Sequence, residues 1–101
     1  MIARFWRGYT KHNNASEYQN FLLKTFLPRL HRLNGYKKSY VLRNDKAHDV
    51  EFVVITLWES FEAIKEFAGP NLHTPVIAPE AEKLLTRFDE QAKHYNVWES
   101  T

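Results

Sequence analysis

Two of the five histidines have types and positions that could contribute to chemistry at a site. His73 follows Gly69-Pro70 in a stretch without regular periodicity, where an imidazole could serve as a base or hydrogen-bond donor near neutral pH. An exposed loop histidine is the simpler alternative. His94 stands beside Tyr95 near the C-terminus, and because adjacent strand residues point to opposite faces, at most one of the two can enter a given pocket. The histidines form no pair at helical metal-ligand spacing, so the sequence predicts no metal site.

Tryptophan and arginine side chains supply the candidates for binding a ligand. Trp58 ends an apolar run just before a helix, which favours a place beside a pocket, and Trp6 is a second candidate. Each could instead be a core aromatic whose indole N–H is hydrogen-bonded. Arg4 and Arg43 could bind a phenolate or a carboxylate, or could lie at an interface or a solvent edge.

The composition argues against several classes of function. The 101 residues carry a formal charge of +2 with both signs interspersed, so no basic stripe indicates nucleic-acid binding. The chain has no cysteine, which excludes disulfides and thiolate catalysis and fits a reducing cytoplasm. Its three glycines cannot build a phosphate-binding loop. No segment approaches the roughly 18 to 20 apolar residues of a membrane span, so we expect a cytoplasmic protein that binds no membrane.

One domain is expected over residues 1–101, beginning with a strand and a helix. The alternation from Ile2 to Thr10 predicts a strand with Arg4 and Trp6 on one face. Asn14 and Glu17 resemble a capping pair, and apolar residues then keep helical spacing as far as Leu33. Pro28 should kink or divide this helix, and Asn34-Gly35 should end it.

A hairpin and a second helix follow. Tyr36–Arg43 reads as a strand, residues 44–49 as a polar loop, and the apolar run from Phe52 to Trp58 as a strand buried on both faces. Ser60 suits the N-cap of a short amphipathic helix that ends near Gly69-Pro70.

The C-terminal third completes the pattern. Residues 71–78 read as irregular, Pro79 suits the first position of another short helix, and a final strand is expected from about Glu90 to Trp98. The order predicts an α+β, ferredoxin-like βαββαβ plait: a four-stranded antiparallel sheet with helices on one face. The bare face would carry either the set beginning with Phe52 or the set beginning with Val53, and both are too apolar to face water. We therefore expect a homodimer that covers it.

Four segments of the chain carry a likeness to a known family. They are IARFWRGYT, LNGYKKSYVLR, EFVVITLWESFEAIKEFAG and RFDEQAKHYNV, and together they extend over nearly the whole chain. The most recognisable feature is Trp58-Glu59-Ser60, followed by a helix with Glu62-Ala63 and Phe67. With these features the chain resembles the antibiotic biosynthesis monooxygenase (ABM) family of dimeric α+β barrel proteins.

The resemblance implies a homodimer whose sheets form a barrel, with a pocket between sheet and helices in each subunit. The best-understood enzymes of the family oxidise polycyclic phenols to quinones with molecular oxygen and need no metal or flavin. The implied activity is a cofactor-independent monooxygenase acting on a small aromatic, phenol- or quinol-like molecule. For this activity, the candidates from the sequence are His73 and Trp58 as catalytic residues and Trp6, Phe67, Arg4, His94 and Tyr95 as substrate-binding residues.

Two other readings stay open. The first is a homodimer of the same fold that binds a small molecule without turnover. The second is a dimer with a filled core and no ligand, which an open pocket of roughly 300 Å³ or more would exclude.

A heme-degrading branch of the family carries an Asn on the first strand, a Trp in the second helix and a His ten positions further on. Here the first strand reads Arg4-Phe5-Trp6-Arg7, the helix position is Phe67, and the histidine position is Ile77. These departures argue against heme degradation.

Overall fold

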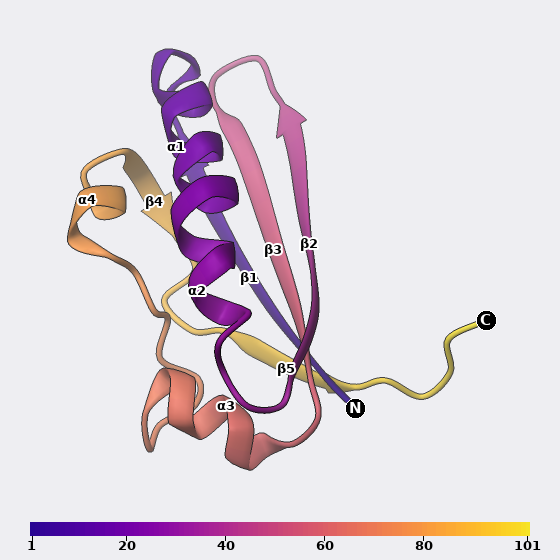
Figure 1. The fold of residues 1–101 in the computed structure, drawn as a ribbon. Coiled ribbons are helices and arrows are strands. Elements are labelled where there is room, and N and C mark those ends of the chain that lie inside the picture. Colours follow the sequence, from indigo (N-terminus) through magenta and orange to yellow (C-terminus); the bar gives the residue numbers. More distant parts are fainter.

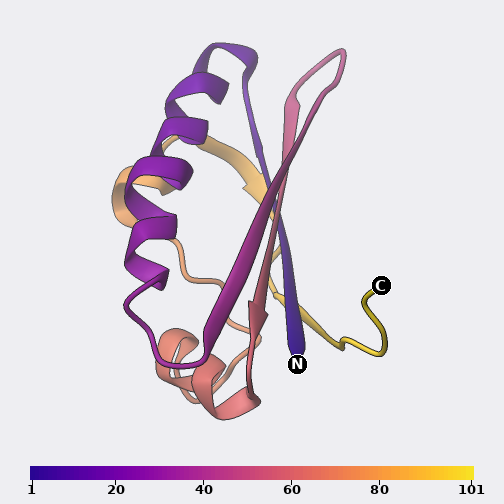
Figure 2. The same cartoon turned by 45° about the vertical axis from the view of Figure 1, so that its right-hand side comes forward.

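A five-stranded antiparallel sheet carries all of the helices on one of its faces (Figures 1 and 2). This computed structural model describes residues 1–101. The strand order is β2-β3-β1-β4, and β5 pairs with β1 as well. The predicted α+β, ferredoxin-like arrangement is confirmed, with five strands in place of four.

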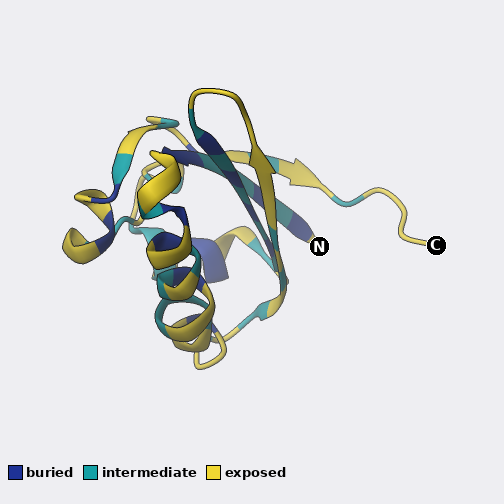
Figure 3. Ribbon diagram, turned by 90° about the horizontal axis from the view of Figure 1, so that it is seen from above, coloured by how far each residue is buried: buried dark blue, intermediate teal, exposed yellow.

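The first strand and the hairpin form the centre of the sheet. β1 spans Ile2–Thr10 and pairs along its whole length with β3, Val50–Trp58. β2, Tyr36–Asp45, is the edge strand of the hairpin and is largely exposed (Figure 3). Both hairpin strands run two residues further toward the turn than the sequence predicted, because pairing continues through Asp45 and Val50.

The first helix follows a 3₁₀ turn at His12–Asn14 and is divided, as predicted from Pro28. It runs as α1, Ala15–Phe21, then a π turn at Leu22–Phe26, then α2, Leu27–Leu30. Proline lacks an N–H and its ring clashes with the carbonyl four residues earlier, and the wider π turn just before it accommodates both effects. The predicted capping by Asn14 is wrong: its side chain makes no cap hydrogen bond, because the 3₁₀ turn ahead of it places Asn14 in helical backbone geometry.

The second helix has the predicted signals at both ends. Ser60 Oγ accepts a hydrogen bond from the Ala63 N–H at 3.2 Å and so caps α3, Phe61–Ala68. Gly69 ends the helix with a φ of 93°, a conformation that glycine adopts without strain. Residues 71–78 are irregular, and a short helix α4, Pro79–Glu82, begins at the predicted proline. No helix of the structure is both long and apolar enough to cross a membrane.

The predicted final strand from Glu90 to Trp98 is confirmed in its central part, as β5 at Lys93–Asn96. The sequence did not predict the strand before it, β4 at Leu85–Phe88; both strands pair with the same edge of β1. Between them the backbone N–H of Asp89 donates to the carbonyl of Arg7, and the Asp89 carboxylate accepts from the Arg7 side chain at 2.9 Å. Asp89 thus anchors the break between the two strands.

Burial alternates along β3 and divides the sheet into two faces. Phe52, Val54, Thr56 and Trp58 are buried beneath the helices, whereas Val53, Ile55 and Leu57 are only partly buried on the other side. Of the two sets considered in the sequence analysis, the one that begins with Val53 therefore lies on the side that no helix covers. We call the side away from the helices the outer face; its apolar residues are Ala3, Phe5, Tyr40, Leu42, Val53, Ile55, Leu57 and Tyr95. No element of the chain covers it (Figure 2).

Candidate functional site

A cavity lies between the inner face of the sheet and the helices. It is walled by β1 and β3, by the first helix, by the end of α3, and by the irregular segment leading into α4. Eleven of the 14 lining residues are hydrophobic; the full set is Arg4, Trp6, Tyr18, Phe21, Leu22, Phe26, Val54, Thr56, Phe67, Pro75, Val76, Ile77, Ala78 and Ala81. The lining is thus largely aromatic and aliphatic, with a single charged group.

The cavity is narrow. Its unfilled space is about 520 Å³ when the open mouth is included, but the centres of water-sized molecules reach only about 40 Å³ of it. At roughly 10 to 15 Å³ per water, this smaller volume holds about three waters. A molecule with fused rings therefore enters only if part of the wall moves.

Arg4 is the charged residue of the cavity, and it is buried, with 5% of its surface exposed. Its Nη1 donates to the carbonyl of Leu72 and lies 3.0 Å from Nε2 of His94, and its Nη2 donates to the carbonyl of Thr74 at 2.8 Å. Burial lowers the pKa of Arg4 to about 10, so it remains protonated at neutral pH. None of its partners is a carboxylate, and the cation is therefore held by neutral groups.

His94 is the cross-strand neighbour of Arg4 on β5. Burial, and then the nearby Arg4 and His73, lower the pKa of His94 to about 4, so its ring is neutral near pH 7. Because arginine can only donate, Nε2 of His94 must accept from it, and the ring proton must sit on Nδ1. That Nδ1 is buried and has no hydrogen-bond partner in the protein.

The irregular residues 71–78, which we call the covering segment, form one wall of the cavity. Arg4 binds two of its carbonyls, and the carbonyl of His73 accepts a hydrogen bond from the Ala92 N–H at 2.7 Å. The His73 ring is exposed and packs edge-on against His94, with the ring centroids 5.2 Å apart. The segment is therefore tied to the sheet mainly through Arg4 and Ala92.

Tyr18 supplies a hydroxyl to the opposite wall, on α1. It is 2% exposed, and burial raises the pKa of its phenol, which keeps it protonated. A protonated phenol hydroxyl can donate a hydrogen bond to a ligand oxygen. The sequence analysis used Tyr18 only as part of the helical apolar pattern; the signal that distinguishes it from its neighbours is its polar end on a buried helix face.

Trp6 completes the aromatic wall on β1. Its indole N–H donates to the carbonyl of Asp89 at 2.8 Å. The absence of a side chain at Gly8 leaves room for this ring, because a Cβ added at Gly8 would lie only 2.8 Å from it. Trp6, Arg4 and Phe67, all candidates from the sequence, do line the cavity.

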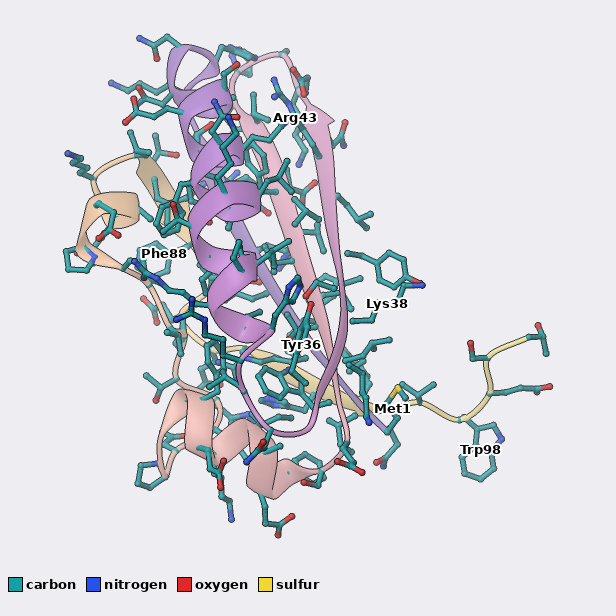
Figure 4. All side chains as sticks on the ribbon, viewed as in Figure 1. Met1, Tyr36, Lys38, Arg43, Phe88 and Trp98 are labelled. Carbon is teal, nitrogen blue, oxygen red and sulfur yellow. The ribbon has the colours of Figure 1, made fainter.

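Other candidates lie elsewhere. Trp58 does not line the cavity: it is fully buried, donates its indole N–H to Thr56 Oγ1 at 2.8 Å, and stacks on the far side of Phe67, with the ring centroids 5.3 Å apart. Tyr95 is 54% exposed on the outer face, as the alternation with His94 requires. Arg43 pairs with Asp45 near the hairpin end of β2 (Figure 4). His73 and His94 gather around Arg4 without lining the cavity itself.

No three His, Asp or Glu side chains lie close enough together to share a metal ion. Phe67 and Ile77, two of the three positions at which the sequence was expected to depart from the heme-degrading branch, both line the cavity with apolar side chains.

Of three comparisons with known proteins, one found matches, and these concern the fold. No known protein-family model matches the chain, and no curated protein sequence matches it. Solved structures do match. A candidate antibiotic biosynthesis monooxygenase from Bacillus cereus is 19% identical, with 100% of this chain and 94% of that one covered and a TM-score of 0.66.

Two further structures have described activities. SnoaB, a cofactor-independent oxygenase from Streptomyces nogalater, is 20% identical, with 98% of this chain and 95% of that one covered and a TM-score of 0.65. MhuD, a heme-degrader from Mycobacterium tuberculosis solved with two hemes in its active site, is 23% identical, with 100% and 99% covered and a TM-score of 0.58. At these identities the likeness concerns the fold. The chain has the fold of the antibiotic biosynthesis monooxygenases, as its sequence predicted.

Proposed function

We propose that this protein is a cofactor-independent monooxygenase that oxidises a small phenol- or quinol-like aromatic substrate with molecular oxygen. The observation that carries the proposal is an aromatic cavity whose one charged side chain is a buried, protonated arginine. The same fold hosts an oxygenase of this kind in Streptomyces nogalater. Fold alone does not define an activity, so the chemistry rests on the residues of the cavity.

Those residues suit the steps of such a reaction. The aromatic walls hold the ring, Tyr18 donates a hydrogen bond, and the cation of Arg4 favours the phenolate over the phenol. The phenolate passes an electron to oxygen, the two radicals combine at ring carbon, and loss of water leaves the quinone. Overall, the phenol and one O₂ give the quinone and one water. We assign the uptake of the phenolic proton to His73, whose exposed imidazole packs against His94, the neighbour of Arg4.

Oxygen uptake tests the activity. Purified protein, treated with a chelator and freed of flavin, is mixed with a panel of mono- and polycyclic phenols, and the consumption of oxygen and the formation of quinone are followed together. The expected result is one O₂ consumed per quinone formed, with activity lost in Arg4→Met. If no phenol on the panel is consumed faster than in buffer, the proposed activity is wrong.

A second candidate function is small-molecule binding without turnover. It is favoured by one observation, namely that no His, Asp or Glu lines the cavity, so proton uptake depends on a residue of the covering segment. Binding of a phenol with no oxygen uptake would decide for this candidate.

We also propose that two copies pair through the outer face. Exposed Tyr40, Leu42 and Tyr95 border a partly buried centre on β1 and β3, and a large apolar patch of this kind marks an interaction site. A twofold axis would bring two identical sheets face to face and cover both patches.

A further inference from the structure

We infer that the cavity selects aromatic ligands that carry an oxyanion, a carboxylate or a phenolate, and that this oxyanion binds the free N–H groups of Arg4. The inference deepens the proposed function, since it specifies the ligand of the same cavity. It concerns binding, however, and can be tested without any oxidation.

The charge of Arg4 has no anionic partner in the protein. A buried cation is normally paired with an anion, because removing it from water is costly. Here the partners are two backbone carbonyls and a neutral imidazole, and no carboxylate forms a salt bridge with Arg4. Asp89 also binds β1, but its carboxylate pairs with Arg7 and not with Arg4. The inner end of the cavity therefore carries an uncompensated positive charge.

The guanidinium of Arg4 has more N–H donors than the protein has acceptors for them. A guanidinium has five N–H groups, and the protein provides acceptors for three of them in Arg4. Two N–H groups therefore remain, which is the number that one carboxylate accepts in a bidentate pair. The Nδ1–H of His94, which lies beside Arg4 but outside the cavity lining, is buried and also has no partner. Donors are thus in excess at this end of the cavity, and no side-chain acceptor balances them.

The rest of the cavity defines the remainder of the ligand. The Phe67 ring lies under the guanidinium at 5.6 Å, and Trp6, Phe21 and Phe26 continue the aromatic wall. Such walls accept a flat, apolar ring and offer little to a second charge. An aryl group with one terminal oxyanion satisfies both ends.

Binding has a consequence for the covering segment. The cavity is too narrow for a fused ring system as it stands, and Arg4 is the main link between the sheet and the carbonyls of Leu72 and Thr74. An oxyanion on the two remaining N–H groups neutralises the guanidinium charge and so weakens its hydrogen bonds to those carbonyls, which loosens the segment at the point where room is needed. An uncharged ligand has no such effect.

The experiment compares charge-matched pairs of ligands. Benzoate and 2-naphthoate, each with its uncharged methyl ester, are bound to the full-length protein at pH 7.5 under nitrogen, and affinities are measured by equilibrium dialysis. The expected result is that at least one acid binds about 10- to 100-fold tighter than its ester, since hydrogen bonds to charged groups are the strong ones. Hydrogen exchange at residues 71–78 should rise with the acid and not with the ester.

Three variants locate the effect. Arg4→Met should abolish the preference for the acid, Arg4→Lys should restore part of it, and Arg43→Met should leave it unchanged, because Arg43 is paired with Asp45 outside the cavity. Circular dichroism establishes that each variant is folded. If Arg4→Met does not fold, the acid–ester comparison in the wild-type protein and Arg4→Lys still decide the question.

The inference is overturned if both esters bind as tightly as their acids, if folded Arg4→Met keeps the preference, or if neither acid binds the wild-type protein. A second experiment identifies the oxyanion by measuring the affinities for 2-naphthol and 2-methoxynaphthalene from pH 7 to pH 10. If the affinity for 2-naphthol rises as it ionises, phenolates bind. If its affinity does not change with pH, the site is restricted to carboxylates. Acid binding without any oxygen uptake from phenols would support the inference while refuting the proposed monooxygenase activity.

Discussion

Arg4 on β1 and His94 on β5 are cross-strand neighbours whose side chains meet, with Nη1 of the arginine 3.0 Å from Nε2 of the histidine. Burial and then this contact lower the pKa of His94 and keep its ring neutral, and the contact fixes the tautomer, since Nε2 must accept from the guanidinium. It also leaves the charge of Arg4 free of any anion. The pairing of two basic residues, which looks unfavourable by itself, is what makes the cavity selective for negative charge.

The neutral state of His94 predicts an acid sensitivity of the fold. Its pKa falls from the ordinary 6.5 to about 4 on folding, so between these values the unfolded chain binds a proton that the folded chain does not. The free energy of unfolding therefore decreases as the pH is lowered from 6.5 to 4. His94→Gln, whose amide can still accept from Arg4, should show a smaller decrease in melting temperature over this window.

The control for that prediction is His48→Gln, because His48 is exposed in the hairpin loop. Its melting temperature should follow the wild-type dependence on pH. Equal slopes for the wild-type protein and His94→Gln would show that His94 titrates alike in the folded and unfolded chains.

The two inner tryptophans should respond differently to replacement. Trp6→Phe and Trp58→Phe each remove one indole hydrogen bond, so each should lower the free energy of unfolding by about 1 to 3 kcal/mol. Only Trp6 lines the cavity, however, and only Trp6→Phe should weaken the binding of 2-naphthoate, by several-fold. Dialysis with both variants checks this. A larger loss of affinity in Trp58→Phe would mean that the cavity extends to Trp58 when it is occupied.

Local signals in the sequence were enough to predict most of the elements. The apolar run of β3, the cap at Ser60 and the stop at Gly69 each act within a few residues of the structure that they determine. The two-strand ending was not predictable in this way. It depends on Asp89 meeting Arg7 across 82 positions of the chain, and Leu85, which opens β4, fits a helical pattern equally well.

Part of the candidate site was predictable, because alternate side chains of a strand lie on the same face of the sheet. Because Arg4 and Trp6 share a face of β1, both were expected together, and both line the cavity. The partners of Arg4 could not be foreseen, since two of them are backbone carbonyls in an irregular segment, which any residue type provides. Trp58 was misplaced because its position at a strand end does not reveal that Thr56 satisfies its indole and Phe67 separates it from the cavity.

The N-cap at Ser60 should contribute measurably to stability. Ser60→Ala removes the acceptor for the Ala63 N–H and should lower the free energy of unfolding by about 0.5 to 2 kcal/mol. Ser16→Ala is the matched control, because Ser16 is an exposed residue of α1 with no side-chain hydrogen bond, and alanine favours helix there. Urea unfolding of both variants checks the prediction. Equal stability of Ser60→Ala and the wild-type protein would contradict the capping geometry.

The outer face offers a matched test of dimerisation. Leu42 and Leu23 are 49% and 48% exposed, but Leu42 lies on the outer face of the sheet and Leu23 on the first helix. The wild-type protein should sediment at about twice its 12.0 kDa monomer mass at micromolar concentration. Leu42→Asp places a charge in the proposed interface and should shift the protein toward the monomer, whereas Leu23→Asp should remain a dimer because its site stays in water. A monomeric wild-type protein, or equal behaviour of the two variants, would show that the outer face is not where two copies meet.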